Sequence, residues 1–500
     1  MKNKLDRLRV ILGEVADLNQ IFNLVNWDQE TYMPPGAAQS RSQQLATIAK
    51  IIHEKATAEE IGLLIDDLKP WAASLDKKSN EYRLITVVAK DFDKNSRIPP
   101  EFMAEEARVT SMARQAWMEA RAKADFKLFQ AHLEKILELN QRYVSFFPPK
   151  DHPYDLLLDN FEPGMKTADV KGIFDELRPL QIELIKAVGK HPQVDDAFLH
   201  LGYDEKKQWD FSVEVIRAVG YDLNRGRLDK SAHPFSTSFS MDDVRITTRF
   251  ERDSGVSALF SSLHEAGHAL YEQGFDPVWK RTPIADGSSL AMHESQSRLW
   301  ENIIGRSRPF WEYYFPKLKA LFPAQLNNVT LDQFYRGINK VQPSLIRVEA
   351  DEATYNLHIM LRFELEIAMI EGKLPIKELP SAWNDKMQAY LGIVPPDDAL
   401  GVLQDIHWSL GSLGYFPTYA LGNLISAQLW EKYQSINSDI SDQIRKGDFS
   451  ALLAWLRDAI HQYGRKYEPK ELVTRITRSN IDPTPYMRYL TAKFGEIYEL

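Results

Sequence analysis

The sequence predicts a mainly α-helical protein in which residues 1–500 form one multi-lobed body. Apolar residues recur at three- and four-residue spacing through most of the chain, which is the periodicity of amphipathic helices. No long Gly/Ser linker interrupts these segments, and no internal repeat is visible, so we expect one domain and not a string of them. Proline and glycine clusters separate the periodic segments: "MPPG" (33–36), "IPPE" (98–101), "PPKDHP" (148–153), "EPG" (162–164) and "VPPDD" (394–398).

Composition narrows the classes of function. The chain has 44% hydrophobic and 26% charged residues, which is typical of a globular protein. Its net charge of −9 argues against a general nucleic-acid binder, because such proteins carry a basic surface for phosphates. The chain contains no cysteine, which excludes disulfides, thiolate metal sites and a cysteine nucleophile. Any metal must therefore be bound by His, Asp or Glu.

The first 30 residues predict an amphipathic helix. Leu5, Leu8, Ile11, Val15 and Leu18 follow helical spacing, and the continuous apolar segment of a signal peptide is missing. No apolar run along the chain approaches the roughly 20 residues that a membrane span needs. We therefore expect a cytoplasmic location and no membrane partner. The segment 102–147 also predicts helix, because charged residues separate apolar ones at the same spacing.

The segment "PFSTSFSMDDVRITTRF" (234–250) departs from the helical pattern. Val244, Ile246 and Thr248 alternate with polar residues, and period-two alternation of β-branched residues predicts a strand. The turn sequence "MDD" (241–243) precedes it. We predict a β-hairpin here, directly ahead of the next helix; a purely structural role would be to cover one edge of the core.

The next helix, "SSLHEAGHALYEQG" (261–274), contains an HExxH motif. His264 and His268 are four residues apart and share one helix face, so both can bind one ion. Glu265 is rotated by about 100° and can reach a water molecule at the ion without binding the ion itself. In zinc peptidases the ion acidifies this water and the glutamate takes its proton. Gly267 leaves room beside the site for another backbone segment. The alternative is coincidence, because short motifs produce false positives.

A third protein ligand is needed to complete such a site. The metzincin motif requires Gly at 271 and His at 274, but the chain has Tyr271 and Gly274 there, which excludes that class. The predicted helix "SSLAMHESQSRLWENIIG" (288–305) carries Glu294 and Glu301. They are seven residues apart and lie near one helix face, so spacing does not choose between them. Either could instead be a plain surface acid.

Together with further stretches, these motifs make the whole chain resemble the carboxypeptidase Taq family of metallocarboxypeptidases. The matching stretches are "WDQETYMPPG" (27–36), "HPF" (233–235), "DVRIT" (243–247), "HEAGH" (264–268), "HESQ" (293–296), "IRVEAD" (346–351) and "GVLQDIHW" (401–408). The resemblance implies a metal-dependent carboxypeptidase that releases single C-terminal amino acids from peptides with broad specificity.

The same resemblance implies the site and the architecture. His264, His268 and Glu294 would bind one Zn²⁺ (or Co²⁺) ion per subunit, and Glu265 would be the general base. The fold would be neurolysin-like, with two helical lobes around a long deep groove and the β-hairpin beside the metal helix. A homodimer is also implied.

Hydrogen-bond donors for a developing oxyanion follow later in the chain. His407 and the tyrosines of "GSLGYFPTYALG" (411–422) are the candidates, and one face of a turn or helix can present both Tyr415 and Tyr419. We expect His407 and Tyr419 to act in catalysis and Tyr415 to contact substrate. The alternative is that these are ordinary buried aromatic residues. Gln404 and Asp405 are expected to orient His407 or a ligand.

An exopeptidase must also bind a free carboxylate, which the arginine guanidinium does with two parallel hydrogen bonds. Arg347 in "IRVEAD" is the candidate; the alternative is that it only pairs with Asp351 four residues later. Arg245 in the hairpin is a weaker candidate and alternatively forms an internal ion pair. His233 precedes a proline, which favours an extended or turn conformation, and it contacts either substrate or the hairpin.

Two other functions stay open on the residues alone. A metallo-oligopeptidase or dipeptidyl carboxypeptidase would use the same metal chemistry with a differently placed carboxylate-binding group. A helical scaffold protein would carry HEAGH by coincidence.

Overall fold

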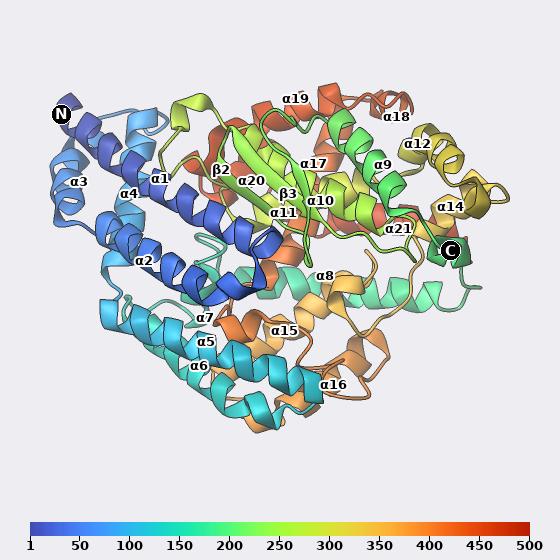
Figure 1. Cartoon of the computed structure of the whole chain (residues 1–500), viewed down its shortest axis with the longest axis horizontal. Coiled ribbons are helices and arrows are strands. Elements are labelled where there is room, and N and C mark those ends of the chain that lie inside the picture. Colours follow the sequence, from blue (N-terminus) through green and yellow to red (C-terminus); the bar gives the residue numbers. More distant parts are fainter.

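Helices form most of the molecule, as the apolar periodicity predicts (Figure 1). The structure, a computed structural model, describes residues 1–500. The first part of the chain contains α1 (Lys2–Thr31), α2 (Ala38–Ala56), α3 (Glu59–Ala72), α4 (Asn80–Ser96), α5 (Pro100–Lys123), α6 (Lys127–Ser145), α7 (Tyr154–Leu158), α8 (Thr167–Val188) and α9 (Glu205–Ala218).

The helices after residue 250 include those that carry the site. They are α10 (Ser257–Gln273), α11 (Leu290–Arg298), the π-helical segment η4 (Leu299–Ile304), α12 (Arg308–Leu321), α13 (Pro323–Leu326), α14 (Leu331–Ile338), α15 (Tyr355–Ile370), α16 (Leu379–Leu391), α17 (Pro417–Ile436), α18 (Ile440–Ile444), α19 (Ser450–Ala459), α20 (Pro469–Thr477) and α21 (Thr484–Tyr498). Short 3₁₀ turns connect several of them: η1 (Pro35–Ala37), η2 (Ala197–His200), η3 (Pro277–Trp279), η5 (Arg347–Glu349), η6 (Ile376–Glu378), η7 (His407–Leu410) and η8 (His461–Lys466).

The predicted proline and glycine clusters separate helices, although several other helix ends carry no such cluster. The five proline and glycine clusters lie at or between helix ends, and Pro100 is the first residue of α5, where its missing N–H removes no helical hydrogen bond. The segment 102–147, however, is divided between α5 and α6. Ala124 ends α5 in a left-handed conformation with φ of 51°. No glycine or proline marks this break, so the apolar spacing alone did not reveal it.

The predicted hairpin is confirmed and belongs to a three-stranded sheet. Strands β2 (Ser236–Ser240) and β3 (Asp243–Thr248) are antiparallel, with Ser238 opposite Val244. A third strand, β1 (Leu228–Lys230), pairs in parallel with β3 and was not predicted, because three residues carry no readable alternation. Since β3 is the central strand and its Val244 and Ile246 are fully buried, the sheet does more than cover an edge.

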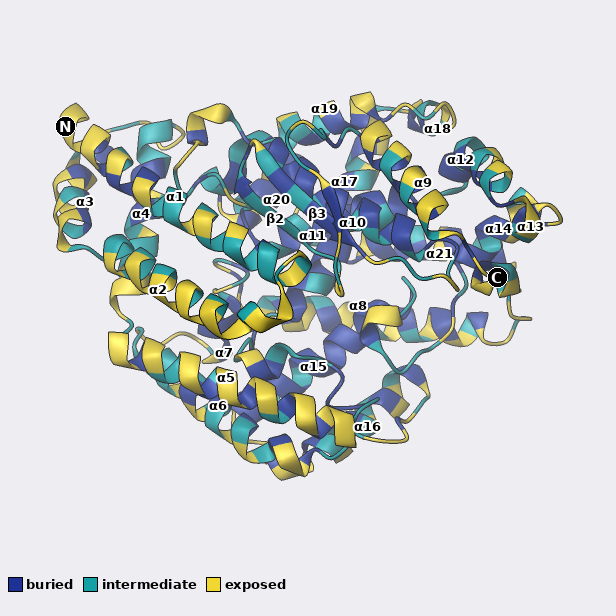
Figure 2. Cartoon of the chain, viewed as in Figure 1, coloured by how far each residue is buried: buried dark blue, intermediate teal, exposed yellow.

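The site lies on largely buried helices. Figure 2 shows α10, α11 and α17 as largely buried, whereas the outer faces of α1, α2 and α5 are exposed. Helix α10 packs between β3 and α11, and α17 covers α11 on another side. A single contiguous cluster of buried apolar side chains extends from Leu5 to Tyr498. None of the helices combines the length and the apolar character that crossing a bilayer would require.

Two glycines let the backbones of the site approach closely. A Cβ on Gly267 of α10 would lie 2.5 Å from the Cα of Ser297 in α11, so the expectation that another backbone approaches here is confirmed. A Cβ on Gly422 of α17 would lie 2.6 Å from the Cγ of Glu294. The distances between α10, α11 and α17 therefore depend on these two positions.

We expect Gly267→Ala to destabilise the protein by about 1–3 kcal/mol, because the added methyl group overlaps backbone atoms that cannot rotate away. The free energy of unfolding is measured by urea denaturation followed by circular dichroism. Gly172→Ala in α8 is the matched control, since no atom lies within 4 Å of its added Cβ. Alanine is the better helix former, so this control should be unchanged or slightly stabilised. Equal stability of both variants would contradict the close packing at Gly267.

Candidate metal centre and active site

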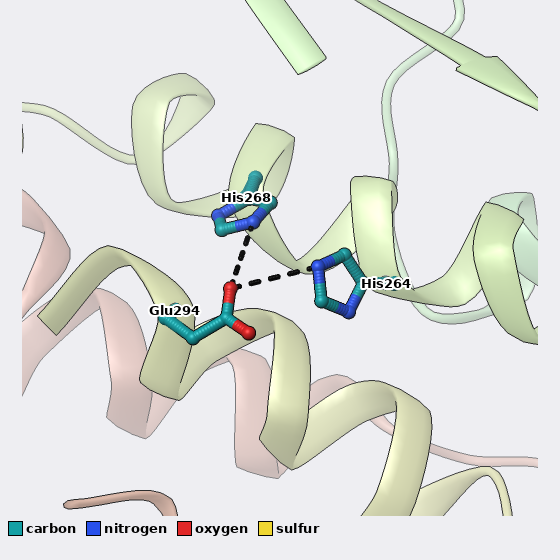
Figure 3. Close-up of side chains that lie close together, drawn as sticks. All are labelled: His264, His268 and Glu294. Carbon is teal, nitrogen blue, oxygen red and sulfur yellow. Dashed lines mark ion pairs between the residues drawn. The ribbon is translucent and has the colours of Figure 1, made fainter. Parts of the chain in front are cut away.

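Three potential ligands converge between α10 and α11. His264 and His268 project from one face of α10, and Glu294 projects toward them from α11 (Figure 3). The Oε2 atom of Glu294 lies 3.5 Å from Nε2 of His264 and 3.4 Å from Nε2 of His268. All three ligand atoms lie within 4.8 Å of one another. The predicted cluster is therefore assembled by two neighbouring helices.

This donor set fits a divalent metal ion. Tetrahedral coordination with bonds of about 2.0–2.2 Å places ligand atoms about 3.3–3.6 Å apart. The two distances from Glu294 Oε2 to the imidazole nitrogens, 3.5 and 3.4 Å, fall in this range. Two imidazoles and a single carboxylate are also a ligand set that leaves one position for water.

Glu301 has a different place in the site from Glu294. Its Oε2 lies 2.8 Å from Nδ1 of His264, on the side of the imidazole that faces away from Glu294. Glu301 belongs to the π-helical segment η4, which continues α11 after Arg298. The two glutamates thus bracket the His264 ring, and only Glu294 lies beside both Nε2 atoms. Such a carboxylate on the far nitrogen orients a metal-binding imidazole.

His268 also has a partner at its Nδ1 atom, as His264 has Glu301. This partner was not predicted from the sequence. Its Nδ1 lies 2.6 Å from Nδ1 of His293, and Nε2 of His293 lies 3.2 Å from Glu272. When the Nδ1–H of His268 donates to His293, Nε2 of His268 is left with its lone pair toward Glu294. The position of His293 in the "HESQ" stretch was the available signal for this role.

Glu265 follows His264 on α10 and is buried beside the cluster, with 6% of its surface exposed. Burial raises the pKa of its carboxyl group to about 7; the neighbouring His264 opposes this shift and Glu294 adds to it. A carboxylate with a pKa near neutrality suits general-base catalysis at neutral pH.

A cavity of about 910 Å³ opens onto these groups. It is lined by His264, Glu265 and Glu294 and also by Arg347 and Tyr419. With Pro234 of "HPF", the structure therefore brings residues from four of the quoted motifs and from the tyrosine segment to one space. His268 and Tyr415 are not among its lining residues.

His407, Tyr415 and Tyr419 form one aromatic cluster. Nε2 of His407 lies 3.2 Å from the Tyr419 hydroxyl, and the rings of Tyr415 and Tyr419 are 5.3 Å apart. Burial lowers the pKa of His407 to about 4, so its imidazole is neutral at pH 7. Of the three, Tyr419 lines the cavity.

Arg347 is buried at the cavity wall, with 5% of its surface exposed. Its Nε and Nη2 donate to Oδ1 of Asp405 at 3.0 and 2.8 Å, and its Nη1 donates to the Tyr355 hydroxyl at 2.8 Å. The alternative pairing with Asp351 is wrong, because that carboxylate accepts hydrogen bonds from nearby backbone N–H groups.

Asp405 and Gln404 hold arginines. Asp405 accepts from Arg362 as well as from Arg347, and Oε1 of Gln404 accepts from the backbone N–H of Arg347 and from Nη2 of Arg362. Both residues were expected to orient a ligand or His407, and the groups that they contact are these two arginines, whose guanidinium groups match carboxylate geometry.

Arg245 and His233 are not among the residues that line the cavity. Arg245 donates to both oxygens of Asp243 at 2.8 Å, and its guanidinium stacks 4.5 Å from the ring centre of Trp27. These contacts match the alternative that Arg245 forms an internal ion pair. His233 is exposed just before β2, and its neighbour Pro234 lines the cavity.

Comparisons of the sequence and of the structure with known proteins all find carboxypeptidases of one family. The family described as carboxypeptidase Taq (M32) metallopeptidase matches residues 7–494. The chain is 36% identical over 493 residues to carboxypeptidase 1 of Bacillus subtilis, covering 98% of each chain. It is 38% identical over 495 residues to thermostable carboxypeptidase 1 of Thermus thermophilus, covering 97% of each. The crystal structure of an M32 carboxypeptidase from Deinococcus radiodurans R1 matches with a TM-score of 0.96 and 41% identity over 100% of both chains.

Proposed function

Because the chain belongs to the carboxypeptidase Taq (M32) metallopeptidase family, and is thus a metal-dependent carboxypeptidase, we propose that its metal is one Zn²⁺ ion held by His264, His268 and Glu294. The observation that carries the proposal is the position of Glu294 Oε2, at 3.5 and 3.4 Å from the two Nε2 atoms. Two nitrogens and one carboxylate oxygen form a ligand set that Zn²⁺ favours. Co²⁺ accepts the same ligands and can replace it.

Glu265 is the proposed general base. When bound, the metal ion acidifies a water molecule and polarises the scissile carbonyl group. The Glu265 carboxylate accepts a proton as water attacks the carbonyl carbon, and it then donates this proton to the leaving amine.

Tyr419 and His407 are proposed to stabilise the oxyanion that develops on the carbonyl oxygen. The Tyr419 hydroxyl lines the cavity and lies 3.2 Å from Nε2 of His407. A neutral His407 can accept from or donate to this hydroxyl and so fix its direction. A donor held in place before the reaction costs no reorganisation when the charge develops.

Arg347 is proposed to bind the substrate's free C-terminal carboxylate. One carboxylate, Asp405, faces two buried guanidinium groups, those of Arg347 and Arg362. The three groups together carry one excess positive charge next to the cavity, which favours an anionic partner. Tyr355 contacts Arg347 from the cavity side and limits its movement.

The finer features expected from the sequence stay predictions of this proposal. They are broad specificity, a neurolysin-like groove between two lobes of one domain, a homodimer and a cytoplasmic location. Support for the groove comes from the cavity, whose lining residues come from α10, α11, α15 and α17 and from the segment after α14. His233 and Tyr415 are proposed as substrate contacts, whereas the contacts of Arg245 support the alternative of an internal ion pair with Asp243.

Peptides with free and amidated C-termini test the exopeptidase reaction. We expect the protein to release single residues from free C-termini and to act on the amidated forms at least about 10-fold more slowly, because an amide removes the charge that Arg347 binds. Time-resolved mass spectrometry with and without chelator identifies the products. Equal cleavage of both forms would favour the alternative, a metallo-oligopeptidase, and release of dipeptides would favour a dipeptidyl carboxypeptidase.

A further inference from the structure

Arg298, the last residue of α11, contacts both glutamates that surround His264. Its Nε donates to Oε1 of Glu294 at 2.6 Å, and its Nη1 lies 3.4 Å from Oε2 of Glu301. Glu301 Oε2 is the atom that contacts Nδ1 of His264. One guanidinium group therefore joins the proposed carboxylate ligand to the group that orients a proposed imidazole ligand.

The contact to Glu294 determines which of its oxygens is available. Oε1 is occupied by Arg298, whereas Oε2 is the oxygen near both imidazole nitrogens. The strong charge-assisted hydrogen bond to Oε1 leaves Oε2 as the oxygen that would contact a metal ion. One-oxygen binding would suit a four-coordinate site with one position left for water.

The charges around Arg298 indicate a second role for it, which is to offset the repulsion between neighbouring carboxylates. Glu265, Glu294 and Glu301 all line one cavity, and like charges at this spacing repel one another in a buried site. Arg298 contacts two of these carboxylates, whereas Arg306 reaches Glu301 at 3.6 Å. Glu294 and Glu301 can therefore stay in position beside Glu265 before a metal ion arrives.

The guanidinium itself is held in a fixed orientation. It lies 4.6 Å from the ring centre of Tyr355, and 14% of the Arg298 side chain is exposed. The planar guanidinium reaches two carboxylates at once while stacking on an aromatic face, which the single ammonium group of lysine cannot do.

We infer that Arg298 is a positioning residue of the metal centre, which holds Glu294 as a one-oxygen ligand and keeps the ligand set assembled without the ion. This inference rests on the proposed ligands His264, His268 and Glu294. Arg298 acts through Glu294 and Glu301 and has no direct part in bond cleavage.

The test compares Arg298→Met, Arg298→Lys and the control Arg306→Met in the full chain. Zn²⁺ affinity is measured by competition with a chelator, and coordination by the visible absorption of the Co²⁺-loaded protein. We expect Arg298→Met to weaken Zn²⁺ binding about 10- to 100-fold, the usual effect of removing an outer partner of a ligand. Its Co²⁺ bands should also weaken, because a two-oxygen Glu294 raises the coordination number above four.

Arg298→Lys should recover part of the affinity, and Arg306→Met should keep the wild-type spectrum. An unchanged Co²⁺ spectrum in Arg298→Met would overturn the inference even if affinity fell, and so would an equal loss in Arg306→Met. If Arg298→Met does not fold, the Co²⁺ spectrum of Arg298→Lys decides in the same way. Glu294→Gln separates the two proposals: if it binds Zn²⁺ normally, the ligand assignment itself fails.

Discussion

Replacing Glu265 with glutamine is expected to lower kcat by about 10²- to 10⁴-fold, the usual contribution of a general base. The amide of glutamine cannot accept the proton of the attacking water. It has nearly the same shape as the carboxylate, and Glu265 is not among the proposed ligands, so the protein should keep one Zn²⁺ ion per chain. The rate is measured on a short peptide with a free C-terminus, and the metal content by elemental analysis.

Glu349→Gln is the matched control for this prediction. Glu349 also lines the cavity, but it is exposed and follows Arg347 in η5 instead of the metal helix. We expect this variant to keep nearly the wild-type rate. If Glu265→Gln retains both its metal and its wild-type kcat, Glu265 is not the general base and another group must take the proton.

Replacing Glu294 with glutamine is expected to reduce Zn²⁺ affinity more than any other change of a single glutamate at this site. The variant loses the charged ligand and replaces the charged 2.6 Å partner of the buried Arg298 with a neutral amide. A buried charge that loses a counter-charge is costly, so a lower unfolding temperature of the metal-free protein should accompany the loss. Chelator competition gives the affinity and differential scanning calorimetry gives the temperature.

Glu301→Gln provides the comparison for Glu294→Gln. The glutamine carbonyl can still accept a hydrogen bond from Nδ1 of His264, so we expect a loss of about 10- to 100-fold at most, as for an outer partner. The order of the two effects is the decisive result. A greater loss in Glu301→Gln would exchange the roles of the two glutamates.

Local patterns were sufficient for much of the fold and for the centre of the site. The 3.6-residue period predicted the helices, and the two-residue period predicted the β2–β3 hairpin, because both depend on neighbours along the chain. The HExxH spacing placed His264 and His268 on one helix face for the same reason. The helix break at Ala124 and the short strand β1 were not predicted, because neither is marked by a pattern in its own residues.

Hydrogen-bond partners that are far apart in the sequence could not be predicted from residue spacing. Arg347 pairs with Asp405 and not with Asp351, because tertiary packing brings η5 against the turn before η7. The contact between His293 and His268 was not predicted for a similar reason, since it depends on how α11 packs against α10. In each case the favourable partner is the one that folding leaves within hydrogen-bond distance in a buried setting.

The sequence by itself determined the helical class, the His264–Glu265–His268 face and the absence of thiolate ligands. Helix geometry is local, so residues four apart share a face wherever the helix lies. Spacing left Glu294 and Glu301 open and the family resemblance implied Glu294, whereas the tertiary structure shows that Glu294 and not Glu301 lies beside both Nε2 atoms. The physical reason is the close approach of α10 and α11 at Gly267. This approach determines which position of α11 places its carboxylate opposite the two imidazoles.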